Sequence, residues 1–254
     1  MKARPTWLGG AIGIVGLIAV WWLLAAFDVA GGTIPSPGTV VSTMYSDGWS
    51  LYGPNFGITA SGALKGFLWG NALAIALGVA IILVPPIESL ATQLAILSYC
   101  TPLLALGPII LVVFGGRTPT IFLAAMYCFF TTMVGTVAGL RSADPASLDL
   151  VEAYGGGAWQ KFTKVQLVAA APSTFAALKI AAPSAVLGAI LGEYLGGVDS
   201  GIGVALTAAQ TSYNVPRTWG MAIAAAALAG LGYAIVAAIA RLVTPWTSAQ
   251  GALR

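Results

Sequence analysis

Histidine is absent from the chain, and charged residues make up only 7% of its 254 positions. Without histidine, the chain can build neither a Ser-His or Cys-His nucleophilic site nor a His-ligated metal site. No GxxxxGK[ST] loop occurs, which excludes that way of binding ATP. The two cysteines, Cys100 and Cys128, make a poor metal site and are expected to be small buried packing residues. We therefore expect no catalytic residue, no metal and no cofactor bound by this chain.

Polar surface is scarce as well. Hydrophobic residues make up 58% of the chain, whereas a soluble domain carries about a quarter charged residues. A globule of this size could not cover its surface with so few charges. The net charge of +3, from 11 basic and 8 acidic residues, is too small to indicate a nucleic-acid partner. The composition predicts an integral membrane protein in contact with lipid.

Apolar segments recur along the chain at lengths that can cross a bilayer, which takes about 20 helical residues. Alternation of apolar and polar residues, which is typical of membrane strands, is absent. We therefore predict an all-α polytopic protein with one transmembrane domain over residues 1–254. Its six expected spans are 7–27, 60–84, 91–114, 118–141, 172–196 and 217–241. The first apolar run is longer than a signal-peptide core and is interpreted as an uncleaved span.

The distribution of lysine and arginine predicts the orientation of these spans, because basic residues concentrate on the cytoplasmic side. If the N-terminus is cytoplasmic, that side holds Lys2, Arg4, Arg141, Lys161, Lys164, Lys179, Arg241 and Arg254. The opposite side holds Lys65, Arg117 and Arg217. The asymmetry predicts cytoplasmic termini and a cytoplasmic loop over 142–171.

This loop, residues 142–171, is a polar island between apolar runs. Asp149 and Glu152 fall on one side of a first short helix, and three glycines from Gly155 follow as a turn. A second short helix places Ala158, Trp159, Phe162 and Val165 within an arc of about 120°, opposite Gln160, Lys161 and Lys164. Such a helix rests on lipid headgroups or fills a groove in a cytoplasmic partner, and the residues alone leave both open.

Four residues in or beside the spans are candidates for a translocation path or gate. Pro102 and Pro108 interrupt the segment 91–114, and such breaks are tolerated where protein or water satisfies the freed carbonyls. Lys179 is expected near the inner end of its span, where it can snorkel or bond the helix ends of the loop. Glu193 is expected near the outer end, where it can contact solute or bond the backbone of 197–216.

Glycines recur at helical spacing in two spans. Gly188, Gly192 and Gly196 form a GxxxGxxxG ridge, and Gly66 and Gly70 begin another. Small residues at this spacing let membrane helices approach closely. We expect them to pack helices within the subunit, while a role between subunits or along a pore stays open.

The polar island resembles the cytoplasmic "EAA" signature of type I binding-protein-dependent ABC importer permeases. Asp149 matches its acidic position, Gly155 its glycine, Val165 and Leu167 its aliphatic pair, and Pro172 its second proline. The chain departs from the signature in having aspartate for glutamate, Leu150 and Val151 for two alanines, and Val168 for the first proline. The stretches "IPSPGTVV", "TPLLALGPIILVVFGGRTPTIFLA" and "LKIAAPSAVLGAILGEYLGG" also resemble the sulfonate, taurine and nitrate branch.

The resemblance implies a permease subunit of the bacterial inner membrane that moves a small solute inward. Its implied partners are a second permease copy, ATPase subunits that hold ATP and magnesium, and an extracytoplasmic substrate-binding protein. The residues implied to couple it to the ATPase are Asp149, Glu152, Gly155, Ala158, Trp159, Phe162, Lys164 and Val165. Phe162 is expected to be the central anchor. Two other functions stay open, a secondary transporter and a membrane scaffold that moves nothing.

The predicted topology can be tested by labelling. Single cysteines at Ser147 and Ser212, in a chain without native thiols, should react differently with an impermeant thiol reagent applied outside. Position 212 should be labelled and position 147 should not, because only position 147 lies in the predicted cytoplasmic loop. Labelling of position 147 from outside would overturn the topology.

Overall fold

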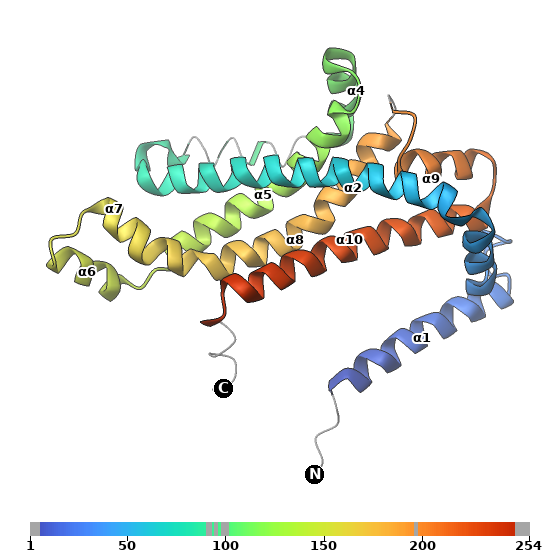
Figure 1. The fold of residues 1–254 in the computed structure, drawn as a ribbon, viewed down its shortest axis with the longest axis horizontal. Coiled ribbons are helices and arrows are strands. Elements are labelled where there is room, and N and C mark those ends of the chain that lie inside the picture. Colours follow the sequence, from blue (N-terminus) through green and yellow to red (C-terminus); the bar gives the residue numbers. More distant parts are fainter. Residues whose placement is uncertain (1–5, 90–92, 94–95, 98–101, 196–197, 247–254) are drawn as a thin grey trace, which may run out of the picture.

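The computed structural model describes residues 6–246, with gaps at 90–92, 94–95, 98–101 and 196–197. Every regular element in the described ranges is helical, which confirms the predicted all-α class (Figure 1). The elements are α1 (Thr6–Ala26), α2 (Pro37–Leu83), the 3-10 turn η1 (Pro85–Ile87), α4 (Leu103–Phe114), α5 (Thr118–Arg141), α6 (Pro145–Ala153), α7 (Ala158–Lys161), the π turn η2 (Phe162–Gln166), α8 (Leu167–Tyr194), α9 (Ile202–Thr211) and α10 (Val215–Val243).

Five helices in the described part of the chain are long and apolar enough to cross a membrane, which agrees with a polytopic membrane protein. They are Gly9–Ala26, Pro37–Leu83, Thr118–Arg141, Ala158–Tyr194 and Val215–Val243. The first half of the segment predicted at 91–114 falls largely outside the described residues. Its second half is α4, a helix of 12 residues that includes Pro108.

Two helices begin earlier than the sequence suggested. The helix predicted at 60–84 starts at Pro37, because the Ser36 hydroxyl accepts the Thr39 N–H at 3.1 Å and proline occupies the first turn. Its backbone leaves the helical conformation only at Gly48, where φ is 66° and ψ is 179°, and the helix bends there. The helix predicted at 172–196 starts at Ala158.

The antiparallel pair α5 and α8 forms the centre of the bundle, with α2 and α10 packed against it (Figure 1). Glycines make this approach possible. A Cβ atom at Gly188 would lie 2.7 Å from Ala124 Cα, and one at Gly192 would lie 2.5 Å from Thr120 Cα. Gly66 and Gly70 of α2 meet α5 in the same way. Packing within the subunit is therefore confirmed for these four glycines, while Gly196 lies outside the described residues.

Some of the polar groups between these helices bond across the helix contacts. The Thr132 hydroxyl of α5 donates to the Asn71 side-chain oxygen of α2, and both residues are buried. The thiol of Cys128, which is fully buried, lies 3.2 Å from the carbonyl oxygen of Ala181 in α8. Cys128 is thus the buried packing residue that was predicted, whereas Cys100 lies outside the described residues.

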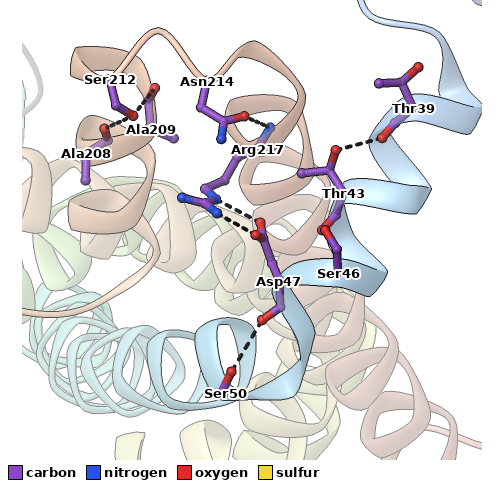
Figure 2. A network of polar contacts seen from close by, with 10 residues as sticks. All are labelled: Thr39, Thr43, Ser46, Asp47, Ser50, Ala208, Ala209, Ser212, Asn214 and Arg217. Atoms are coloured by element: carbon purple, nitrogen blue, oxygen red, sulfur yellow. Dashed lines mark hydrogen bonds and ion pairs between the residues drawn. The ribbon is translucent and has the colours of Figure 1, made fainter.

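A second polar network lies where α2 bends, at the end predicted to face away from the cytoplasm (Figure 2). The Arg217 guanidinium of α10 donates to both carboxylate oxygens of Asp47, with Nε at 2.8 Å from Oδ2. Asn214 caps α10 by accepting the Arg217 N–H at 3.1 Å. This pair ties the bend of α2 to the start of α10.

Helix α1 stands apart from the bundle and is attached near its C-terminal end (Figure 1). The indole of Trp21 stacks on that of Trp219 with 5.3 Å between ring centroids. Each indole N–H also donates to a backbone carbonyl of the connection, Trp21 to Pro35 and Trp219 to Thr33. The exposed sides of α1 are apolar, as expected for a helix that faces lipid.

We predict that Gly188→Ala destabilises the bundle, because its methyl group would overlap the α5 backbone. Overpacking of this kind typically costs about 1–3 kcal/mol. Thermal unfolding in detergent should show a lower midpoint for this variant. Gly232→Ala is the matched control, since its nearest neighbour would lie at 3.7 Å and both changes gain the same helix propensity. Equal midpoints for the two variants would contradict the close α5–α8 contact.

Candidate functional site

The predicted cytoplasmic loop begins with a well-capped helix, α6. The Asp144 carboxylate accepts the Ser147 N–H at 3.2 Å, and Pro145 occupies the first helical position. Just after the helix, the chain turns at Gly155, whose φ of 76° is unfavourable for other residues. The Gly156 N–H then donates to the Val151 carbonyl at 2.8 Å. The glycines form the sharp turn that their spacing predicted.

An exposed ion pair joins the two helices on either side of this turn. The Lys161 ammonium of α7 donates to the Glu152 carboxylate of α6, and this hydrogen bond, together with the lysine's charge, lowers the pKa of Glu152. The Glu152 side chain is 67% exposed. Exposed pairs of this kind contribute little to stability. The pair therefore orients α6 relative to α7 without fixing it rigidly.

Helix α7 is continuous with α8, which corrects the prediction of a separate second short helix. The π turn η2 joins the two, and Figure 1 shows α7 running directly into α8. Consequently the segment 158–171 belongs to the same rod as the predicted fifth span. The sequence could not show this, because polar residues such as Lys161 and Lys164 interrupt the apolar pattern without breaking the helix.

Phe162 lies inside the bundle, so its expected place on an exposed docking face is wrong. It is 5% exposed and packs with Leu140 and Ala170, against Val79 and Ile82 of α2. The physical reason is that α7 runs straight into α8, so Phe162 already lies beside the bundle, where Leu140 of α5 and two side chains of α2 cover it. The arc drawn for a regular isolated helix therefore does not describe this segment.

Trp159 is the aromatic residue that remains on the surface, 66% exposed and 5.6 Å from the Phe162 ring between centroids. Leu150 and Tyr154 of the neighbouring helix are also exposed, at 58% and 87%, and sequence reasoning missed both. Their spacing of four residues on α6 could have indicated a shared face. Of the other predicted coupling residues, Asp149, Glu152, Gly155, Ala158 and Lys164 are exposed and Val165 is half-buried.

The two prolines of the predicted path lie in or beside α4. Pro102 precedes the helix as its N-cap and Pro108 lies inside it. The helix projects away from α5 (Figure 1), and Ile109, Val112 and Val113 are exposed. The proline positions thus coincide with a short, displaced helix rather than with a continuous span in the described residues.

Lys179 lies deeper than predicted. Its neighbours Ala177 and Ala181 contact the middle of α5, at Gly135 and Cys128. Lys179 is therefore level with about Thr132, roughly 13 Å along α5 from its inner end at Arg141, at 1.5 Å per residue. The side chain is half-buried and takes part in none of the three ion pairs found in the described residues. The residue therefore lies about midway along the contact between α5 and α8, further from the inner end than expected.

Glu193 is buried near the opposite end of α8, with 1% of its surface exposed. Its carboxylate accepts the Gly203 N–H at 2.9 Å and the Thr59 hydroxyl of α2 at 2.9 Å. The expected bond to the backbone of 197–216 is therefore confirmed. Thr59, which sequence reasoning did not single out, is the only partner that α2 supplies to this carboxylate in the described residues.

Residues 70–249 match the family described as "Binding-protein-dependent transport system inner membrane component". The match covers well over half of the chain, from within α2 through α10, and it includes the predicted cytoplasmic loop 142–171.

Two individual relatives align over nearly the full length and a third over about three fifths of it. The chain is 27% identical to the formylaminopyrimidine transport permease protein ThiX of Halalkalibacterium halodurans, covering 92% of this chain and 94% of ThiX. It is 26% identical to the putative aliphatic sulfonates transport permease protein SsuC of Bacillus subtilis, covering 96% and 90%. It is 29% identical to the riboflavin transport system permease protein RibX of Chloroflexus aurantiacus, over 63% and 59%.

The burial of Phe162 predicts that Phe162→Ala destabilises the folded chain. Truncating a buried phenylalanine typically costs about 3–5 kcal/mol. Trp159→Ala should leave the unfolding midpoint nearly unchanged, since that side chain is mostly exposed. Thermal unfolding of both variants in detergent checks the contrast. A larger loss for Trp159→Ala than for Phe162→Ala would show that the two rings exchange roles.

Proposed function

Because the chain belongs to the family of binding-protein-dependent transport system inner membrane components, we propose that its segment 145–161 receives an ATPase subunit. The chain is a pore-forming permease subunit of an ABC importer and a multi-pass protein of the inner membrane. Its partners are in general an ATPase and a substrate-binding protein. The segment, α6 with the glycine turn and α7, is called the coupling element.

One observation carries the proposal: the coupling element exposes a tryptophan while the next aromatic residue anchors it to the bundle. Tryptophan and tyrosine dominate the binding energy of protein interfaces because they bury large areas at low entropic cost. Trp159 and Tyr154 have those properties here, at 66% and 87% exposure. A helix resting on lipid, by contrast, would gain from an apolar arc with lysines outward, and the burial of Phe162 removes the centre of that arc.

The fold also supports transmission of movement from this element. The rod from Ala158 to Tyr194 is continuous, and it packs along α5 through close glycine contacts. Packed elements of this kind shift as units rather than deform locally. A displacement at Trp159 would therefore be transmitted to α8. ATP binding and hydrolysis belong to the partner, in keeping with the missing phosphate loop.

We further propose that two copies of the chain enclose the path, with Lys179 on its wall. An ionisable residue at this depth costs free energy unless it faces a partner or a water-filled space. No acidic side chain pairs with Lys179 in the described part of the chain. A space between two copies would satisfy its charge. The named solutes of the relatives include sulfonates, for which a lysine is a suitable transient contact.

Replacing the exposed anchor should separate docking from folding. We predict that Trp159→Asp lowers copurification of the ATPase with the tagged permease by about tenfold or more, because truncating or charging an anchor typically costs about 2 kcal/mol or more. ATP-driven uptake in proteoliposomes should fall in parallel, while membrane insertion and the unfolding midpoint stay close to those of the parent.

Gln160→Glu is the matched control, since it adds the same charge at the next exposed position, removes no ring and keeps an acceptor for the Gly157 N–H. Parental copurification of the ATPase and normal uptake with Trp159→Asp would contradict docking through this surface. Failure of the variant to reach the membrane would instead favour a helix that rests on lipid. ATP-independent accumulation by the chain alone would favour a secondary transporter.

A further inference from the structure

The buried carboxylate of Glu193 joins three separate helices. It accepts the Thr59 hydroxyl of α2, and that hydroxyl in turn accepts the Ile202 N–H of α9 at 2.8 Å. The same carboxylate accepts the Gly203 N–H of α9 at 2.9 Å. Asn55, one turn before Thr59, accepts the Gly201 N–H at 2.8 Å. These four hydrogen-bonded contacts together are called the clasp.

The clasp provides the N-terminal cap of α9. The first N–H groups of a helix have no partner within it and normally bond a side chain just before it. The N-cap residue of α9 is Gly201, which has no side chain to do this. Glu193 and Thr59 supply the acceptors instead, and a negative charge at a helix N-terminus is favourable. The seat of α9 is therefore determined by residues of α8 and α2.

Glycines let the backbone reach the carboxylate. Gly201 has φ of 138°, which L side chains rarely adopt, and a Cβ atom there would lie 2.5 Å from a Glu193 oxygen. A Cβ at Gly203 would lie 2.5 Å from the Ile190 carbonyl. Any larger residue would push α9 away from α8. The turn is thus shaped around this carboxylate.

A hydrophobic residue would hold these helices together at a lower desolvation cost than a buried carboxylate. What the carboxylate adds is direction, because it accepts hydrogen bonds only from groups placed at the right distance and angle. The clasp therefore specifies one position of α9 rather than generally stabilising the bundle.

The end of the molecule that holds the clasp has a second tie, the Asp47–Arg217 pair between α2 and α10, whose side chains are 8% and 38% exposed (Figure 2). The ion pairs of the opposite end are more exposed. Arg141–Glu88 is 51% and 42% exposed, and Lys161–Glu152 is 28% and 67% exposed. Because exposed pairs contribute little, polar ties restrain the two ends unequally.

We infer that the clasp and the Asp47–Arg217 pair make the outer ends of α2, α8, α9 and α10 one rigid unit that closes the outer side of the path. Glu193 is the positioning residue of this unit, because it seats α9. The inner ends have only the more exposed ion pairs, so polar contacts restrain them less when the coupling element is displaced. This inference rests on the chain being an importer permease, but it does not require docking through Trp159.

The experiment measures directly whether α9 keeps its position against α8 and α2. Ala209 of α9 is 2% exposed, so Ala209→Cys, in a chain without Cys100 and Cys128, should react slowly with an impermeant maleimide added from outside. Thr59→Val keeps the side-chain shape and removes the two clasp bonds of this hydroxyl, to Glu193 and from the Ile202 N–H. Thr59→Ser keeps both. Labelling is measured on the permease–ATPase complex in proteoliposomes, together with ATP hydrolysis without the binding protein.

We expect Thr59→Val and Glu193→Ala to raise the labelling rate by about tenfold, the effect of losing a hydrogen bond to a charged group. ATP hydrolysis without the binding protein should rise several-fold, and Thr59→Ser should behave as the parent. Glu193→Gln should be intermediate because one acceptor oxygen remains. This variant keeps the test available if Glu193→Ala fails to fold.

Parental labelling and parental ATP hydrolysis in Thr59→Val and Glu193→Gln would overturn the inference. A lowered unfolding midpoint with unchanged labelling would also overturn it, since the clasp would then serve folding alone. Copurification of the ATPase with Thr59→Val should stay at the parental level, because the clasp lies at the far end of α8 from Trp159. Loss of ATPase copurification with unchanged labelling would count against the rigid outer unit. Docking through the coupling element is tested separately by Trp159→Asp.

Discussion

The close contact between α5 and α8 is the constraint on which the other features depend. Glycines at 188 and 192 bring the two backbones together, and a methyl group at either position would meet the α5 backbone. In lipid no hydrophobic force draws helices together, so such close packing supplies much of the attraction. Because α8 continues to Ala158, the same contact also fixes where the coupling element leaves the bundle.

In the described part of the chain, buried hydrogen bonds between helices are few, and their placement follows from this arrangement. Thr132 and Asn71 bond each other between α5 and α2, and Glu193 bonds Thr59 and the start of α9. Each of these buried groups therefore meets a partner from another helix, as a low-dielectric interior favours. Lys179, by contrast, is charged and forms no ion pair in the described residues. Its surroundings in an assembled transporter therefore matter.

The relatives carry names for three different solutes, formylaminopyrimidine, aliphatic sulfonates and riboflavin. A permease that makes weak contact with its cargo is compatible with that variety, because conduction requires binding that is easily reversed. Under the proposed function, selection of the solute is largely a task of the substrate-binding protein. In that proposal the permease contributes a path and a connection to ATP hydrolysis, and the clasp closes the outer side.

Composition and hydropathy by themselves determined the all-α membrane fold, because burying the backbone in lipid leaves a chain of this pattern no other choice. The glycine turn at Gly155 and the contact of Glu193 with the following backbone could also be predicted, since both follow from local chemistry. Only the tertiary structure decided that Phe162 is buried, that Lys179 lies deep and that Thr59 completes the clasp. Packing sets the π turn, the continuation of the helix through polar residues and the contact between Thr59 and Glu193, which are 134 positions apart in sequence. The periodicity of a single helix encodes none of these.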